Sequence, residues 1–419
     1  MPLLTDEAVR AAVYRIVRET SVLDMHAHLY DPAFGDLLLW GIDELLTYHY
    51  LIAEVLRVAP ISPSEFYELS KQAQAELIWR EMFVERAPLS EACRGVATVL
   101  HKLGLEPGRP NLDEYRAWFA EQSATGYVDL VFERSNVSAV VMTNDPFDDW
   151  ERPFWERGFD RDPRFHAALR IDRLLNDWSS VRSRLSRWDY DVSPHLTPPT
   201  LREIRRFLED WLDRMDARYM AVSLPPDFRY PDPESPRGII LDTCVLPAAQ
   251  SRGVPFALMV GVTRQVNPAL GPASDGVAPA GLGPLINLCA DHPENRFFAT
   301  YLAREDQHGL CVAARKFPNL MPFGCWWFLN NPSLIEEMTR MRVELLGTSF
   351  IPQHSDARVL DQLLYKWDHS REVIARVLAD KYAALHASGW PVTDDVIRRD
   401  VAAYFQTNFN AFATGSSIQ

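Results

Sequence analysis

The feature that most constrains the fold is a regular alternation of short apolar runs with longer segments of helical spacing. The gaps between most runs hold an amphipathic pattern, as in residues 201–217 and 332–346. Buried strands that alternate with helices are typical of a (β/α)8 barrel. We therefore predict an α/β protein with a TIM-type barrel. The eight runs are SVLDMH (21–26), SAVVMTN (138–144), FHAALRI (165–171), YMAVSL (219–224), PFALMVG (255–261), RFFATY (296–301), LMPFGC (320–325) and GTSFIPQ (347–353).

The gap between the first and second runs is much longer than the others. Residues 30–137 have helical spacing almost throughout, and we predict a helical insertion over the C-terminal mouth of the barrel. Residues 371–389 and 393–413 predict extra C-terminal helices. No Gly-x-Gly-x-x-Gly motif follows an early run, so an open doubly wound sheet with a dinucleotide site lacks support. We expect residues 1–419 to form one elaborated barrel domain.

Composition excludes several classes of partner. The chain has 419 residues and a formal net charge of -14, which disfavours binding to nucleic acid or to an anionic membrane. Its five cysteines are odd in number and widely spaced, which argues against a disulfide framework. The first 20 residues do not have the pattern of a signal peptide, and no apolar run could span a bilayer. We predict a soluble cytoplasmic protein, with apolar terminal helices that suit a homo-oligomer.

Polar side chains cluster where the predicted strands end. In such barrels the chemistry lies at the C-terminal strand ends, so these side chains should converge on one mouth. His26 and His28 point to the same face of the first strand, because residues two apart do so. The other polar or aromatic residues at these ends are Asp145, Asp148, Asp149, Arg170, Asp172, Asp227, Arg264, Trp326, Trp327, His354, Asp356 and Arg358.

Closing a barrel places the last strand beside the first, so Asp356 becomes a neighbour of His26 and His28. Two imidazoles and a carboxylate suit one divalent ion, zinc foremost, with manganese, iron and cobalt also compatible. Taken singly, each of these residues could be an ordinary polar residue, as could His354 and His369. The aspartates after the second run are typical of turns. The joint placement is what indicates a metal site.

Five motifs in order resemble those of uronate isomerases, which are metal-dependent (β/α)8 barrels of the amidohydrolase superfamily. The motifs are LDMHAHLYDP, TNDPFDDW, ALRIDR, GCWWFLNNP and SDAR followed by YKWDHSR. The insertion segment LLTYHYL also resembles the part of that family's insertion that carries a His-Tyr pair. The resemblance covers most of the chain, which is similar to a short, divergent member of the glucuronate isomerase group.

The resemblance implies roles for particular residues. It makes His26, His28 and Asp356 the metal ligands and places Arg358 near the reacting hydroxyls. Arg170 would hold the substrate carboxylate.

It further implies that His49 and Tyr50 reach in from the insertion, while Trp327 and Trp367 form walls of the sugar pocket. Tyr50, His49 or Asp356 could carry the proton, and the sequence does not choose between them.

One position departs from the family pattern. Many members carry a histidine in the strand that here is FALMV, where this chain has Met259. A thioether cannot take a proton or orient a metal-bound water as imidazole can.

The activity implied is aldose–ketose isomerisation of a hexuronate, D-glucuronate or D-galacturonate, with a small acidic sugar as the binding partner. Two alternatives stay open. One is a different reaction of the superfamily (an epimerase, lyase, decarboxylase or hydrolase) on another acidic sugar or hydroxy acid. The other is a carbohydrate-binding protein without catalysis.

Overall fold

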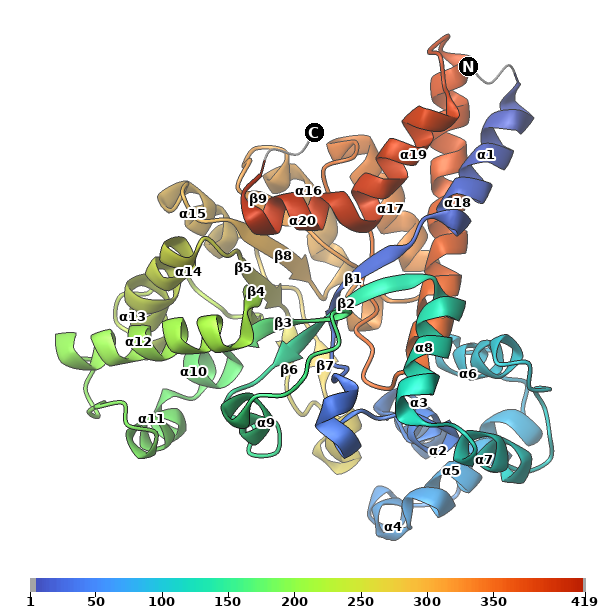
Figure 1. Cartoon of the computed structure of the whole chain (residues 1–419), viewed down its shortest axis with the longest axis horizontal. Coiled ribbons are helices and arrows are strands. Elements are labelled where there is room, and N and C mark those ends of the chain that lie inside the picture. Colours follow the sequence, from blue (N-terminus) through green and yellow to red (C-terminus); the bar gives the residue numbers. More distant parts are fainter. Residues whose placement is uncertain (1–4, 417–419) are drawn as a thin grey trace.

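A curled sheet of parallel strands forms the centre of the computed structural model, which describes residues 5–416 (Figure 1). The strand order is β1-β2-β3-β4-β5-β8-β9, so neighbours in the sheet follow one another along the chain. The strands are β1 (Val22–Ala27), β2 (Val137–Asn144), β3 (Phe165–Arg170), β4 (Ala217–Leu224), β5 (Phe256–Val260), β8 (Phe297–Tyr301) and β9 (Leu320–Pro322). Seven of the eight predicted runs are therefore confirmed as strands of one sheet.

These strands form because their side chains are buried on both faces, as parallel sheets require. Every residue of β5 and of β8 is buried, and helices cover the outer face of the sheet (Figure 1). The β4–β5 and β5–β8 ladders run in register over five residue pairs each. The β1–β2 ladder is less regular, with register shifts after Val22 and again between Asp24 and Ala27.

The eighth predicted strand, 347–353, is wrong as a continuous strand. It makes only one isolated parallel bridge, between Ile351 and Phe323. Gly347 has a φ of 62°, outside the strand region, and Pro352 has no N–H to give to a ladder.

The segment still joins the two edges of the sheet. The Ile351 N–H donates to the Pro322 carbonyl (3.0 Å), and the Asp356 N–H donates to the His26 carbonyl (3.1 Å). The His28 N–H in turn donates to the Ala357 carbonyl (2.7 Å). These bonds close the sheet into a ring, consistent with a TIM-like barrel. We call residues 351–357, which carry them, the closing segment.

Between β1 and β2 the chain is helical, as predicted. These helices are α2 (Ile42–Leu46), α3 (His49–Val58), α4 (Pro63–Glu68), α5 (Lys71–Trp79), α6 (Glu91–Lys102), α7 (Asp113–Ala120) and α8 (Ala124–Ser135). Ser62 caps α4 with a full capping box, and Ser70, Ser90 and Ser123 cap α5, α6 and α8. A new helix therefore begins directly after each of these serines.

The connection after β5 contains a short hairpin that the sequence did not predict. Its two strands, β6 (Val262–Thr263) and β7 (Gly276–Val277), lie outside the main sheet. The loop between them packs on α3, and the Tyr67 hydroxyl of α4 donates to the Leu270 carbonyl. The hairpin and the helices after β1 thus meet beside the strand ends.

The remaining helices alternate with strands or follow the last of them. They are α1 (Asp6–Glu19), α9 (Arg152–Arg157), α10 (Asp172–Asn176), α11 (Trp178–Arg187), α12 (Pro198–Met215), α13 (Pro236–Ile240), α14 (Leu246–Arg252), α15 (Gly283–Asp291), α16 (Gln307–Ala314), α17 (Pro332–Leu346), α18 (Gln362–Ala387), α19 (Asp394–Ala402) and α20 (Asn408–Thr414). Short 3-10 and π segments are η1 (Pro32–Leu37), η2 (Arg80–Val84), η3 (Leu241–Val245), η4 (Pro268–Ala273), η5 (Arg304–Asp306), η6 (Trp327–Leu329) and η7 (Ala403–Thr407).

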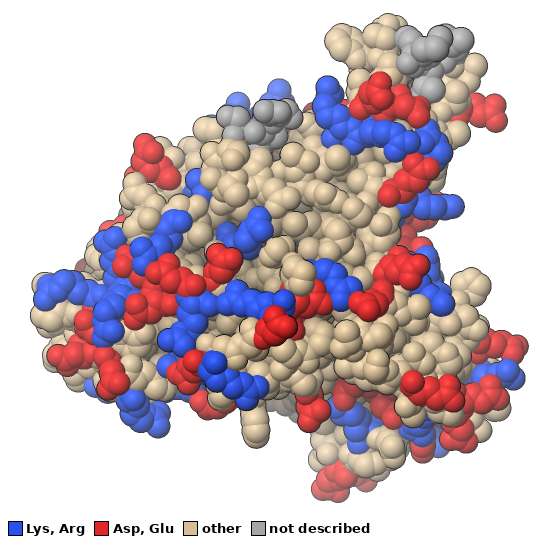
Figure 2. Space-filling view, viewed as in Figure 1, with Lys and Arg blue, Asp and Glu red and all other residues tan. Residues whose placement is uncertain are grey.

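The long helix α18 links the two ends of the chain. It packs along α1, and Arg10 of α1 forms an ion pair with Asp380 of α18 (2.8 Å). Within residues 5–416, every helix is too short or too polar to cross a membrane. Basic and acidic side chains are intermingled over the face in Figure 2, around broad uncharged areas, so the negative net charge is not gathered into one patch there.

Candidate active site

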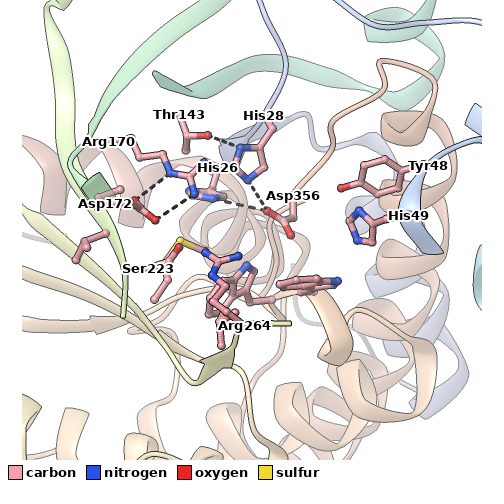
Figure 3. Close-up of a pocket in the computed structure, with 16 residues that line it drawn as sticks. His26, His28, Tyr48, His49, Thr143, Arg170, Asp172, Ser223, Arg264 and Asp356 are labelled. Atoms are coloured by element: carbon pink, nitrogen blue, oxygen red, sulfur yellow. Dashed lines mark hydrogen bonds and ion pairs between the residues drawn. The ribbon is translucent and has the colours of Figure 1, made fainter. Parts of the chain in front are cut away.

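A cavity of about 180 Å³ lies at the C-terminal ends of the strands (Figure 3). It brings together residues from the strands, from the start of α3 and from the closing segment. The lining residues are His26, His28, Tyr48, His49, Thr143, Arg170, Asp172, Ala221, Val222, Ser223, Met259, Val262, Arg264, Trp326, Trp327 and Asp356. Several of the predicted strand-end residues therefore meet at this cavity. Six others do not line it: Asp145, Asp148, Asp149, Asp227, His354 and Arg358.

His26, at the end of β1, is held in one tautomer. The Tyr219 hydroxyl from β4 donates to the Met25 carbonyl (2.7 Å), which uses its single hydrogen. Its oxygen therefore accepts from Nδ1 of His26, 3.1 Å away. This leaves the lone pair on Nε2 of His26, a buried atom with no hydrogen-bond partner among residues 5–416.

His28 is held in the same way by a different residue. The Thr143 hydroxyl from β2 donates to the Ala27 carbonyl (3.2 Å) and accepts from Nδ1 of His28 (2.8 Å). Both imidazoles therefore present an unprotonated Nε2 to the cavity. Metal-binding histidines have this arrangement, in which the second ring nitrogen fixes the tautomer.

Asp356 faces both imidazoles. Its Oδ1 lies 3.7 Å from Nε2 of His26 and 3.3 Å from Nε2 of His28. The three ligand atoms all lie within 4.8 Å of one another. Three electron-rich atoms at this spacing repel one another unless a cation lies between them, and two imidazoles with a carboxylate are a donor set for a divalent transition ion. The residues therefore fit a metal ion.

Electrostatics support this ligand state at neutral pH. Burial is the main cause that lowers the pKa of His26 well below its usual value, and it also lowers the pKa of His28. Burial acts to raise the pKa of Asp356, but the surrounding imidazoles, His28 first, outweigh it and lower that pKa. The cluster therefore offers neutral imidazoles and an ionised carboxylate.

Two of the predicted arginines lie near the cluster. Arg170 lines the cavity and forms a two-point ion pair with Asp172, at 2.9 Å and 3.1 Å. Asp172 is the main cause of its raised pKa, so the guanidinium stays charged. Arg358 donates to the His28 carbonyl (3.1 Å) and lies over the Tyr30 ring.

Arg358 lines a second cavity of about 380 Å³ that adjoins the first. The two cavities share His28, Thr143, Arg170, Asp172 and Arg264. Arg264 pairs with Asp275 on the hairpin loop and lines both cavities. Cationic side chains therefore line both cavities.

Of the pair His49 and Tyr50, only His49 lines the cavity. Tyr48 joins it there, and the two rings lie on the opposite side of Asp356 from the imidazole pair (Figure 3). Burial lowers the pKa of His49 to about 4, so its ring is neutral at physiological pH. The buried Tyr50 hydroxyl has no partner within residues 5–416, and the Tyr50 ring lies 5.4 Å from Nζ of Lys366.

The two predicted aromatic walls have different positions. Trp327 lines the cavity beside Trp326. Trp367 is buried in α18, where its Nε1 donates to Asp24 (3.0 Å), and it does not line the cavity. Met259 of β5 does line the cavity, so the chain presents a thioether at that wall.

Sequence reasoning missed Tyr219, Thr143 and Tyr48, and it gave Arg264 no role. Tyr219 and Thr143 are hydroxyl side chains beside buried apolar residues of β4 and β2, and that contrast was a usable signal for a buried hydrogen-bonding role. Arg264 follows β5 and was noted at a strand end. Its position beside both cavities depends on the hairpin, which has no clear sequence signal.

Known proteins identify the family. No protein-family model matches the chain, and no curated protein is significantly similar to it. A solved uronate isomerase from Bacillus halodurans C-125 is 53% identical, with a TM-score of 0.97, over 99% of this chain and 98% of that one.

Two more distant structures show the same fold. A uronate isomerase from Thermotoga maritima is 16% identical over 98% of this chain and 100% of that one, with a TM-score of 0.78. A glucuronate isomerase from Caulobacter crescentus is 13% identical over 99% and 95%, also with a TM-score of 0.78. The resemblance in the sequence motifs is thus confirmed, and the chain belongs to the uronate isomerase family.

Proposed function

We propose that this protein is a metal-dependent aldose–ketose isomerase of hexuronates, converting D-glucuronate to D-fructuronate, D-galacturonate to D-tagaturonate, or both. The observation that carries the proposal is 53% identity to a uronate isomerase over 99% of the chain. The cluster of His26, His28 and Asp356 at the bottom of the cavity supports it.

The proposed cofactor is one divalent ion, with zinc foremost and manganese, iron and cobalt as alternatives. His26, His28 and Asp356 would hold it. When bound, such an ion supplies positive charge that stabilises an oxyanion of the substrate.

Arg358 is proposed to add positive charge beside the same oxygens, because its guanidinium already lies against the His28 backbone. The isomerisation passes through an enediol, whose negative charge needs fixed positive groups.

Arg170 is proposed to bind the substrate carboxylate and so to fix the sugar's orientation. Asp172 holds the guanidinium in place with two bonds, and the group stays charged at the cavity wall. A fixed guanidinium matches a carboxylate in geometry and charge. Trp327, on the same cavity, is proposed to pack against the sugar.

The proton between C1 and C2 is proposed to move through His49 or Asp356, which both line the cavity, or through Tyr50 behind it. A neutral His49 can accept a proton from carbon and return it. Met259 cannot, so no proton transfer is assigned to β5.

We further propose a single (β/α)8 domain over residues 1–419, with the insertion at 30–137 over the mouth. The positions of Tyr48 and His49 support this placement. A homo-oligomer and a cytoplasmic location are proposed as well. The free, buried state of all five cysteines is consistent with a reducing compartment.

The test is proton NMR of the zinc-loaded protein with D-glucuronate and D-galacturonate in heavy water. We expect ketose signals and loss of the C2 proton signal, both abolished by EDTA. Arg170→Met should raise KM by about thirtyfold, because a charged hydrogen-bond pair contributes roughly 2 kcal/mol. Arg398→Met, a change at an exposed arginine paired with Glu19, is the control.

Turnover of neither uronate by a metal-loaded protein would contradict the proposal. It would direct attention to another reaction of the superfamily on a different hydroxy acid.

A further inference from the structure

Asp356 has a strained backbone conformation, which the surrounding structure must stabilise. Its φ is 52°, in the left-handed region that non-glycine residues rarely occupy. It also lies in the closing segment, where the regular ladder is lost. Some other part of the molecule must therefore fix the position of its carboxylate.

The peptide groups of Ser355, the preceding residue, are held from both sides. Its N–H donates to Oδ1 of Asp24 (3.0 Å), and its carbonyl accepts from Nζ of Lys366 (2.7 Å). The Asn330 amide donates to the same carbonyl at 3.3 Å. A negative and a positive side chain thus hold the peptide units immediately before Asp356.

Asp24 connects this turn to the histidine ligands. It is fully buried in β1, and besides Ser355 it accepts weakly from the His26 N–H (3.4 Å). Its Oδ2 accepts from Nε1 of Trp367 (3.0 Å). One carboxylate therefore contacts the backbone beside two metal ligands and is itself held by α18.

Burying the ammonium group of Lys366 costs free energy, because the charge loses its hydration. Its side chain is 3% exposed, and within residues 5–416 it forms no ion pair and no hydrogen bond other than the one to Ser355. Its ammonium lies 5.4 Å from the Tyr50 ring of α3. A buried, singly bonded ammonium indicates a requirement at this position beyond packing.

We propose that Asp24, Lys366 and Trp367 are positioning residues for the metal site. They hold the Ser355–Asp356 turn so that the carboxylate of Asp356 faces Nε2 of both histidines. Trp367 then acts through Asp24 and not as a wall of the sugar pocket. This inference rests on the proposed metal site at His26, His28 and Asp356.

The experiment measures metal binding directly, with Co²⁺ as a spectroscopic probe and Zn²⁺ in competition with a chelator. The variants are Asp24→Asn, Lys366→Met and Trp367→Phe. We expect each to weaken metal binding by about 10- to 100-fold, the usual effect of losing an outer-shell partner. The visible Co²⁺ bands should shift, because the carboxylate is no longer fixed.

Conservative rescue separates positioning from packing. Lys366→Arg keeps a cation that can reach the Ser355 carbonyl, so it should recover most of the affinity that Lys366→Met loses. At saturating metal, kcat should fall in the three variants while KM for the uronate stays close to that of the wild type.

Asp361→Asn is the matched control. Asp361 is equally buried and accepts from the Tyr127 hydroxyl and the Gly41 N–H, away from the metal ligands. It should lower the melting temperature without changing metal affinity or the Co²⁺ bands.

Wild-type affinity and wild-type Co²⁺ bands in all three variants would overturn the positioning role while leaving the metal site intact. Absence of specific Co²⁺ or Zn²⁺ binding by the wild-type protein would overturn the metal site itself, and the positioning role with it.

Discussion

The strands β1 and β5 are both short, parallel and buried, yet only one of them carries polar chemistry. β1 contains Asp24 and His26, whereas β5 is apolar throughout and contributes Met259 to the cavity. The β5 ladders are regular on both sides, while β1 has register shifts toward β2 and the closing segment on its other side.

The difference shows where a barrel can hold polar groups. A regular ladder satisfies its own backbone groups, so its side chains need only fill space. An interrupted ladder leaves N–H and C=O groups that buried side chains can bind, as Asp24 and Thr143 do. The polar groups of this cavity therefore lie on the side where the strand ladder is interrupted.

The largest expected effect comes from removing a metal ligand on the β1 side. His28→Ala should lower kcat/KM by about a thousandfold, because a Lewis acid contributes several kcal/mol. Steady-state kinetics with metal analysis checks this. Retained metal and near-normal turnover would show that the β1 side does not hold the ion.

The next effect is a loss of stability on acidification. Burial lowers the pKa of His354 to about 4, whereas an unfolded histidine titrates near 6.5. Between these values the unfolded chain binds the extra proton, so stability should fall as pH drops through this range, by on the order of 3 kcal/mol.

Chemical denaturation of the chelator-treated protein at several pH values measures this effect. His354→Leu should flatten the pH dependence, and the exposed His101→Leu should not. If the stability of His354→Leu fell with pH as steeply as that of the wild type, other groups would be responsible for the acid sensitivity.

A loss of stability of similar size is expected where the chain after β9 meets the closing segment. Gly324 has a φ of 64°, and an added Cβ would lie 1.8 Å from Cδ2 of His354. Gly324→Ala should therefore destabilise the protein by about 3 kcal/mol, from steric overlap and the left-handed backbone together.

Gly253→Ala is the control for the cost of the left-handed backbone alone. Gly253 has a φ of 62° in the left-handed α region, with no atom within 4 Å of an added Cβ, so only about 1 kcal/mol should be lost. Equal losses at the two glycines would mean that the region around His354 is loosely packed.

The smallest effect is expected on the β5 side. Met259→Leu conserves volume and should cost under about 1.5 kcal/mol of stability, with kcat/KM within about tenfold of the wild type. If this substitution abolished turnover, the thioether would have a chemical role and the contrast between β1 and β5 would fail.

The sequence predicted the strands and the grouping of His26, His28 and Asp356 well, for a physical reason. Seven runs are buried on both faces, and that burial leaves a continuous apolar signal. His26, His28 and Asp356 were found because strand ends in a barrel converge and its first and last segments are neighbours. Both features follow from the barrel topology, and the alternation of strands and helices in the sequence already predicts that topology.

Details that depend on the start of a helix or on irregular backbone were not predictable. Tyr48 is the N-cap residue of α3 and lines the cavity, whereas the Tyr50 ring packs edge-on against the Tyr48 ring, near Lys366, and does not line the cavity. Trp367 belongs to α18, and its bond to Asp24 depends on how that helix packs. The eighth strand is interrupted because of Gly347 and Pro352. Both lie inside a run whose apolar residues favoured the prediction of a strand.

The bond from the Asp356 N–H to the His26 carbonyl, which helps to close the ring, has a consequence for biosynthesis. His26 and His28 are translated long before Asp356, which follows β9 in the sequence. No nascent chain that ends before Asp356 contains the complete ligand set. All three groups of the proposed metal site can therefore bind an ion together only after the closing segment has been made.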